Sequence, residues 1–162
     1  MNERSSGTLP PSDGPRPPLS RARVVDAAIE LADAEGLAAL SMRRLATRLG
    51  VEAMSLYYHV RNKHDVLGGM LERALADLKF PPAGTPWKPA LRMTALSAHA
   101  VLDRHRWAAA LLMSPSLVSP TRMRWMEAML AALAGARLPA GLADHAYHAL
   151  DSYVVGFTLW QS

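Results

Sequence analysis

The stretch SMRRLATRLGVEAMSLYYHVRNK, from Ser41 to Lys63, decides the fold of this chain. Its first half has apolar residues at intervals of three and four, which predicts a helix over residues 42–49 with one face toward a core. Gly50 is expected to form a tight turn, and residues 53–59 are expected to form a second short helix. Two short helices joined in this way are typical of a helix-turn-helix, whose second helix enters the major groove of DNA.

The second helix has a short, polar and aromatic outer face. Leu56 and Val60 are expected to anchor it on the core. The residues left facing outward are Ala53, Met54, Ser55, Tyr57, Tyr58 and His59. For Tyr58 the alternative is that its ring packs on the helix bundle.

The basic charge of the chain is concentrated in the same region. Between Ser41 and His64 there are five basic residues and one acidic residue, so this segment has a formal charge of +4, which equals that of the whole chain. The basic residues are Arg43, Arg44, Arg48, Arg61 and Lys63. A concentrated basic patch favours phosphate contact, because binding releases counterions from DNA. The alternative is a patch that only keeps the surface soluble.

The composition of the chain limits the fold class and the cellular compartment that we expect. The chain has 162 residues, of which 50% are hydrophobic, so it can hold one domain or two small ones that share a core. Abundant Ala and Leu favour an all-α fold. The absence of cysteine excludes disulfides and thiolate metal sites. The sequence shows neither a signal peptide nor an apolar run of roughly 20 residues, so we expect a cytoplasmic protein without a membrane partner.

Helix signals divide the chain further. Residues 1–19 contain five of the twelve prolines and are predicted to be a disordered arm. Ser20 and Gly36 are suited to begin and end a first helix, and Thr85 is suited to cap a helix that starts at Pro86. Helices are predicted over residues 21–35, 63–78, 86–105, 107–113, 120–134 and from 142 to the C-terminus.

The segment GLAALSMRRLATRLGVEAMSLYYHVRNKHDVL resembles the DNA-binding domain of the tetracycline-repressor (TetR) family. The later segments WKPALRMTALSAHAVLDRHRWAAALL and YHALDSYVVGFTLWQ are similar to the regulatory domain of the tetracycline-repressor branch. The resemblance implies an all-α protein. A three-helix DNA-binding domain of the helix-turn-helix type would occupy residues 20–66, and a helical regulatory, ligand-binding and dimerisation domain would occupy residues 67–162.

The resemblance also implies roles for single residues. The residues expected to contact phosphates are Ser41, Tyr57, His59 and Lys63. Arg43 resembles the arginine of the family that reaches a guanine edge. The residues expected to meet bases are Ala53, Met54 and Ser55, with Tyr58 beside them. Ala53 and Met54 depart from the tetracycline repressor because they are apolar, so they would contact thymine methyl groups and the operator would differ.

Gly68 and Gly69 lie inside the predicted helix over residues 63–78. Each glycine lowers helix stability by roughly 1 kcal/mol relative to alanine. One explanation is close packing against a neighbouring helix. The other is a soft point in the lever that transmits a ligand signal, in which case replacing both glycines by alanine would raise stability and alter induction.

Methionine and tryptophan side chains in the second half are candidates for the walls of an effector site. They are Trp87, Met93, Trp107, Met113, Met126 and Met129. Such side chains suit a small, flat apolar effector, although each of them could equally belong to an ordinary helical core. No metal or cofactor is expected. The helical cluster Asp144, His145, His148 and Asp151 is interpreted as a polar helix face.

The last predicted helix has an apolar stripe suited to association. It contains Leu150, Tyr153, Phe157 and Trp160. The family forms a four-helix dimer interface from two C-terminal helices per subunit, and one such helix is visible here. We therefore expect either an incomplete C-terminal domain or a homodimer with a reduced interface.

The expected function is that of a transcriptional repressor. It would bind a near-palindromic double-stranded DNA operator as a homodimer, and a small apolar effector would release it. The alternative is a helical protein that binds or sequesters small molecules without a DNA function. An enzyme is not expected, because the chain has no phosphate-binding glycine loop, nucleophile elbow or His-Glu-x-x-His motif.

Overall fold

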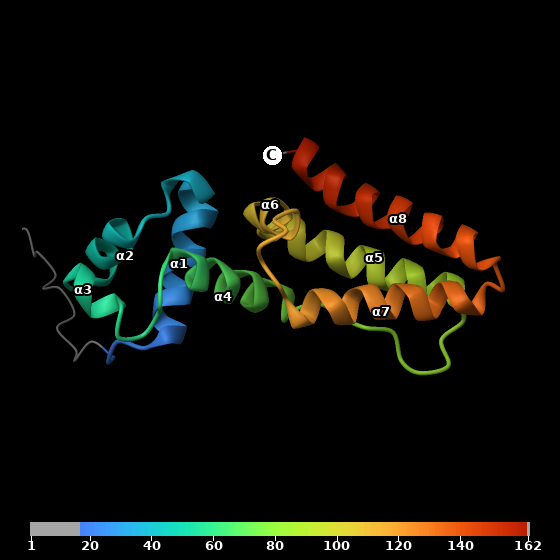
Figure 1. Ribbon diagram of the computed structural model, residues 1–162, viewed down its shortest axis with the longest axis horizontal. Coiled ribbons are helices and arrows are strands. Elements are labelled where there is room, and N and C mark those ends of the chain that lie inside the picture. The colour runs from blue at the N-terminus through green and yellow to red at the C-terminus, as the bar shows by residue number, and fades with distance from the viewer. Residues whose placement is uncertain (1–16, 162) are drawn as a thin grey trace, which may run out of the picture.

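The computed structural model describes residues 17–161, so most of the predicted disordered arm over residues 1–19 lies outside the described residues. The described chain is helical, without strands, and Figure 1 shows an elongated molecule with two lobes. The predicted all-α fold is confirmed. The elements are α1 (Arg21–Glu35), the 3₁₀ helix η1 (Leu37–Ala39), α2 (Met42–Leu49), α3 (Ala53–Leu56), α4 (Lys63–Leu75), α5 (Trp87–Arg104), α6 (Trp107–Leu112), α7 (Pro120–Gly135) and α8 (Ala140–Trp160).

The first lobe, which we call the head, consists of α1, α2, α3 and the first half of α4. The Ser20 hydroxyl caps α1 by accepting the backbone N–H of Arg23 at 3.2 Å. The buried side chains of the head include Val24, Ala28, Leu45 and Leu56, and each is almost fully shielded from solvent. Their burial fixes the relative orientation of the three short helices.

Several predicted helix boundaries are corrected. The α3 helix ends at Leu56 rather than His59, because the N–H groups of Tyr57 and His59 bond to carbonyls three residues earlier and tighten the chain into a turn. The α4 helix ends at Leu75 rather than residue 78. Thr85 does not cap α5, since its hydroxyl donates to the Pro82 carbonyl at 2.7 Å and the N-cap position is taken by Pro86.

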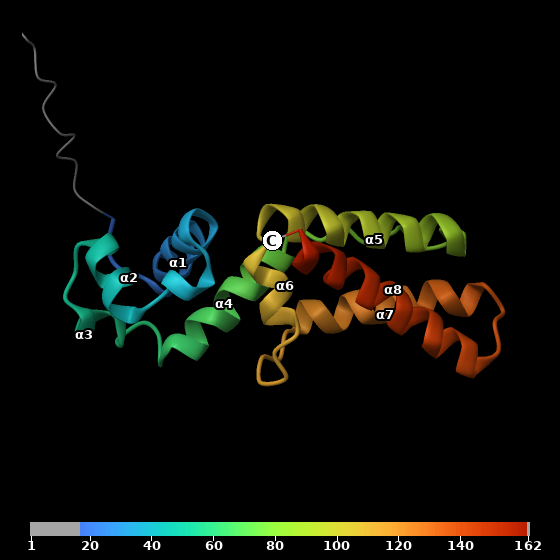
Figure 2. The same ribbon diagram turned by 90° about the horizontal axis from the view of Figure 1, so that it is seen from above.

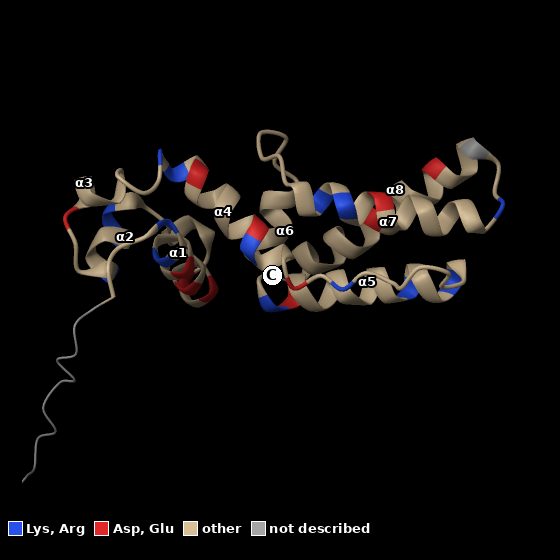
Figure 3. Ribbon diagram, turned by 90° about the horizontal axis from the view of Figure 1, so that it is seen from below, with Lys and Arg blue, Asp and Glu red and all other residues tan. Residues whose placement is uncertain are grey.

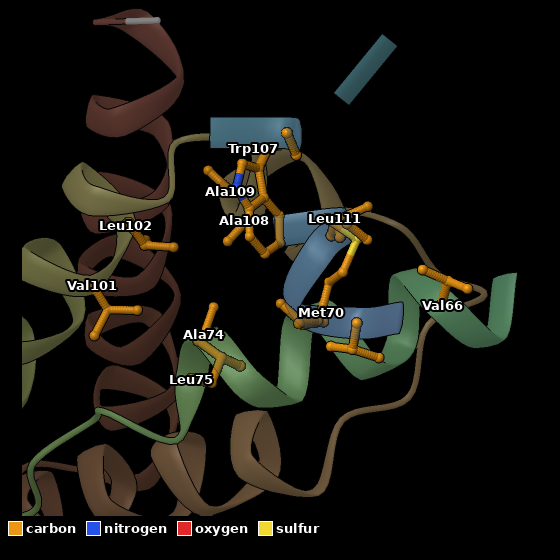
Figure 4. Packing of buried hydrophobic residues seen from close by; sticks show 14 of the residues in the cluster. Val66, Met70, Ala74, Leu75, Val101, Leu102, Trp107, Ala108, Ala109 and Leu111 are labelled. Carbon is orange, nitrogen blue, oxygen red and sulfur yellow. The ribbon is translucent and has the colours of Figure 1, made fainter. Parts of the chain in front are cut away.

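The α4 helix belongs to both lobes. Val66 and Met70 contribute to the core of the head, and Ala74 and Leu75 lie nearer the second lobe. Figure 4 shows Met70 beside Leu111 of α6, within one buried cluster that also holds residues of α1 and α5. A displacement of α4 would therefore disturb packing in both lobes.

Gly69 lies where α4 crosses α1. A Cβ atom added there would stand 2.8 Å from Val25 Cγ2 and 3.3 Å from Arg21 Nη1, so close packing explains this glycine. Gly68 is different, since a Cβ atom added there would stand 3.9 Å from Leu117 Cδ2, which is an ordinary contact distance. Replacing both glycines by alanine is therefore not expected to raise stability, which argues against a soft point at Gly69.

The second lobe, which we call the body, is formed by α5, α6, α7 and α8. Figure 2 shows α5 running alongside α7 and α8, and these three helices contact one another. Trp125 and Met129 of α7 are fully buried, and α8 packs through Tyr147, Val154 and Val155. Among residues 17–161, no helix is both long enough and apolar enough to cross a lipid bilayer.

Candidate nucleic-acid interface

Ser41 and Gly50 fix the two ends of α2. The Ser41 hydroxyl accepts the N–H of Arg44 at 3.2 Å, which leaves its own O–H free to donate to a phosphate oxygen. Gly50 adopts the left-handed conformation (φ 68°, ψ 38°), which permits the sharp turn into α3. The predicted helix, its cap and its turn are confirmed.

Two of the five basic residues are paired with the neighbouring helix rather than presented outward. Arg44 Nη2 lies 2.6 Å from Glu35 Oε2, and Arg48 Nη2 lies 3.0 Å from Glu30 Oε2. Both carboxylates belong to α1, along which Figure 3 shows acidic residues gathered. The basic patch therefore has fewer available charges than the sequence suggests.

The remaining basic side chains lie in the first turn of α2 and at the start of α4. Arg43, Arg61 and Lys63 are exposed, and within the described residues none of their side chains forms a salt bridge. They are available to an anionic partner such as a phosphate backbone.

Three of the six side chains predicted to face outward in the α3 region are exposed. Met54 is 72% exposed and Tyr58 is 88% exposed, so the ring of Tyr58 does not pack on the bundle. Tyr57 is also exposed, while Ala53, Ser55 and His59 are half-buried. Tyr57, Tyr58 and His59 project from the turn that follows α3, not from the helix itself.

Asp65 holds the start of α4 in place, a role that the sequence analysis missed. Its Oδ2 accepts the backbone N–H of Arg61 at 3.0 Å, and its Oδ1 accepts from Arg21 Nη2 at 2.8 Å. These contacts, the Arg61 N–H first, lower the pKa of the Asp65 carboxyl below its ordinary value of 3.8. Asn62 caps the same turn by accepting the Asp65 N–H at 2.9 Å. The spacing Asn-x-x-Asp resembles a capping box and could have indicated this arrangement.

The six residues proposed for an effector site differ in their exposure to solvent. Trp107 is buried at the junction of the lobes, where its Nε1 donates to Asp33 Oδ1 at 2.6 Å. Met129 is fully buried, Trp87 and Met126 are half-buried, and Met93 and Met113 are exposed. Helical phase and packing between helices separate them, so their role in ligand binding stays a prediction.

The residues predicted for dimerisation occupy two environments on α8. Tyr153 is 67% exposed and Trp160 is 83% exposed. Leu150 and Phe157 are half-buried, and the Phe157 ring stacks on Tyr153 with centroids 5.8 Å apart. The exposed aromatic face is compatible with association, and its role also stays a prediction.

The acidic and histidine residues at 144–151 do not gather around one point. Asp151 Oδ2 accepts from Arg122 Nη2 at 2.5 Å, and His148 Nε2 lies 3.5 Å from Asp144 Oδ1. His145 Nδ1 lies 2.5 Å from the Gly141 carbonyl. Within the described part of the chain, no group of three or more His, Asp or Glu residues is arranged to hold a metal ion.

Two family models match the chain. The model described as "Bacterial regulatory proteins, tetR family" matches residues 24–70, and the model described as "Tetracyclin repressor-like, C-terminal domain" matches residues 80–162. The chain belongs to the TetR family. This confirms the resemblance and places the helix-turn-helix described above in the DNA-binding part of the TetR fold.

Individual TetR-family relatives agree with this assignment. The HTH-type transcriptional repressor DrrR1 of Streptomyces coeruleorubidus is 40% identical over 152 residues, which cover 90% of this chain and 55% of DrrR1. The structure of apo ActR from Streptomyces coelicolor matches with a TM-score of 0.77 at 32% identity, over 91% of this chain and 71% of ActR. The structure of BioQ with its DNA operator matches with a TM-score of 0.76 at 28% identity, over 89% of this chain and 86% of BioQ. The chain spans about half the length of the curated relatives it matches.

Proposed function

We propose that this chain is a transcriptional repressor that binds a near-palindromic DNA operator as a homodimer and is released by a small-molecule effector. One observation carries the DNA-binding part. The face formed by α2, α3 and the start of α4 presents exposed basic and aromatic side chains, while the opposite face is buried or paired with α1. The residues of this DNA-binding face are Ser41, Arg43, Ala53, Met54, Ser55, Tyr57, Tyr58, His59 and Lys63.

The chemistry of this face separates base contacts from phosphate contacts. Arg43 is exposed in the first turn of α2 and has the fork of donors that pairs with a guanine edge. Met54 is apolar and exposed, which suits a thymine methyl group. Ser41, with its free O–H, and Lys63, at the first position of α4, suit phosphate oxygens.

Relatives support both partners of the proposed repressor. BioQ has been solved with its double-stranded DNA operator, and ActR has been solved with actinorhodin. A bacterial repressor of this type would act in the cytoplasm, where the chromosome lies. The alternative of small-molecule sequestration without DNA binding has no specific observation in its favour within residues 17–161.

Salt-dependent binding to DNA tests the proposal. Duplexes selected from a random pool would be titrated with the full chain by fluorescence anisotropy at several salt concentrations. We expect a steep fall in affinity with salt, and Lys63→Ala should reduce the log–log slope by about one because one phosphate contact is lost.

Lys79→Ala is the matched control, since Lys79 is exposed beyond the far end of α4 and should leave the slope unchanged. Failure to select any duplex, or a slope near zero, would refute DNA recognition by this chain. An unchanged slope for Lys63→Ala would refute the phosphate contact alone.

A further inference from the structure

Asp33 connects the head to the body. It lies near the C-terminal end of α1, and its Oδ1 accepts the indole N–H of Trp107 at 2.6 Å. Nδ1 of His105 lies 2.9 Å from Oδ1 and 3.1 Å from Oδ2 of the same carboxylate, and it donates because a carboxylate only accepts. His105 follows α5 and Trp107 begins α6, so one side chain of the head holds both sides of the turn between these helices. We call these three residues the clamp.

The clamp is largely shielded from solvent. Trp107 is buried, and the side chains of His105 and Asp33 are 14% and 33% exposed. The two rings contact each other, with their centroids 5.5 Å apart. Hydrogen bonds to a carboxylate are stronger than those between neutral groups, and shielding from water strengthens them. The clamp therefore differs from the exposed ion pairs between α1 and α2, for which water competes.

The other acidic side chains of α1 do not reach the body. Asp26, Glu30 and Glu35 pair with arginines of α4 or α2. Within residues 17–161, Asp33 is therefore the one residue of α1, α2 and α3 whose side chain forms a hydrogen bond or a salt bridge with the body. Beside the clamp, a groove of about 470 Å³ lies between the lobes and is lined by η1, α6 and the end of α8. Apolar packing therefore does not duplicate the clamp at this place.

The clamp lies away from the crossing of α1 and α4. The two helices meet where Val25 faces Gly69, and Asp33 lies about 12 Å further along α1 at 1.5 Å per residue. Figure 1 shows this end of α1 beside α6. A head joined to the body through α4 alone could rotate about that helix. A second contact at a distance from α4 removes this rotation.

We propose that Asp33 is a positioning residue that fixes the rotation of the head on the body and thereby determines which spacing of operator half-sites the homodimer accepts. The effect on spacing rests on the proposed repressor function, whereas the connection between the lobes does not. One added base pair moves a half-site by about 3.4 Å and rotates it by about 34° around the duplex. A head that is free to rotate would tolerate such a change, and a clamped head would reject it.

Pulsed electron spin resonance on the full chain without DNA tests the connection between the lobes. The sequence contains no cysteine, so Thr47→Cys on α2 and Ala131→Cys on α7 provide two exposed sites for spin labels. Labelled chain is diluted in excess unlabelled chain, so that distances within one chain dominate. We expect Asp33→Ala to broaden the distribution of distances between the labels at least twofold. Glu30→Ala is the matched control, since it removes the same charge from α1 but its partner belongs to the head, and it should leave the width unchanged.

Fluorescence anisotropy tests the effect on spacing. The duplexes contain two identical half-sites at the selected spacing, or with one base pair more or fewer between them. We expect the unmodified chain to prefer the selected spacing by at least about tenfold, and Asp33→Ala by less than about threefold. Affinity for a single half-site should change less than about twofold, because the DNA-binding face is not altered. His105→Asn keeps an N–H donor near the position of Nδ1 and should retain the preference, whereas His105→Ala should reduce it at least about threefold.

An unbroadened distance distribution or an unchanged spacing preference in a folded Asp33→Ala chain would overturn the proposal, and so would equal broadening by Glu30→Ala. If circular dichroism shows that Asp33→Ala does not fold, the two His105 variants decide in the same measurements, and equal results for them would overturn the proposal. Failure to select any duplex would refute the repressor function instead. The distance measurement would then still decide whether Asp33 holds the head on the body.

Discussion

At the scale of single residues, the partner of a basic side chain decides whether it can contact DNA. Arg43 and Arg48 lie on the same short helix, and both are exposed. Arg48 is paired with Glu30 at 3.0 Å, whereas the Arg43 side chain has no salt bridge among the described residues. Equal charges on one helix thus have different expected roles.

Arg43→Ala should weaken specific DNA binding by about 1–3 kcal/mol and relax the preference at one base pair. Arg48→Ala removes the same charge but only an exposed ion pair, so specific affinity should change far less. The measurement is fluorescence anisotropy on the selected duplex and on single-base variants of it. Equal losses for the two substitutions would show that Arg43 acts only through net charge.

Asp65 contributes to stability in a pH-dependent way. Its pKa is lowered in the folded chain, chiefly by the Arg61 N–H and then by Arg21, so the contribution is fully present above the ordinary value of 3.8 and is lost as pH falls through the lower folded value. Asp65→Asn should cost about 1–2 kcal/mol at pH 7. Urea denaturation at pH 7 and below pH 3.8 measures this, and the difference from the unmodified chain should shrink in acid. A difference independent of pH would contradict the assigned cause.

At the scale of elements, α4 is constrained by its contact with α1. Gly69→Ala should destabilise the chain by about 1–3 kcal/mol, because the new Cβ would stand 2.8 Å from a branched Val25 methyl group. Gly68→Ala is the matched control. It meets only an ordinary contact at 3.9 Å and should stabilise the helix by up to about 1 kcal/mol. Urea denaturation of the two variants should give changes of opposite sign, and equal changes would contradict the packing argument.

Local signals explain which elements could be predicted from sequence. The bounds of α2 were predictable because Ser41 and Gly50 act within a few residues of the helix they delimit. The early end of α3 was not, since the tight turn at Tyr57–His59 is imposed by anchoring Leu56 and Val60 in the core. Helix ends that depend on packing against distant residues cannot be predicted from local sequence signals.

Contacts between distant segments explain what the sequence did not reveal about the sites. Glu30 and Glu35 neutralise α2 arginines from another helix, so counting charges along the chain overestimated the basic patch. Two polar pairs also join different helices, because Glu72 of α4 accepts from Thr121 of α7, and Asp151 of α8 accepts from Arg122 of α7. The two residues of each pair lie far apart in the sequence, so no local pattern could indicate either pair.

At the scale of the whole molecule, one head cannot measure the distance between two operator half-sites. A homodimer would hold two heads at a fixed separation, and a symmetric interface must present the same surface from both copies. The exposed aromatic residues of α8, Tyr153 and Trp160, are the part of the described body best suited to that role. Pairing would remove the apolar surface of each of these rings from water, which is favourable.

The double variant Tyr153→Glu with Trp160→Glu should therefore be monomeric at concentrations where the unmodified chain sediments as a dimer, because pairing would bury like charges. Its affinity for a palindromic duplex should fall by about 10²–10⁴-fold, the gain that linkage of two binding modules ordinarily provides. Val118→Glu is the control, since Val118 is 79% exposed in the loop before α7 and should change neither property.

Analytical ultracentrifugation and anisotropy on palindromic and half-site duplexes measure both effects. A double variant that stays dimeric would move the interface away from this face of α8, whereas an unmodified chain that is monomeric yet binds the palindrome tightly would refute the requirement for two heads.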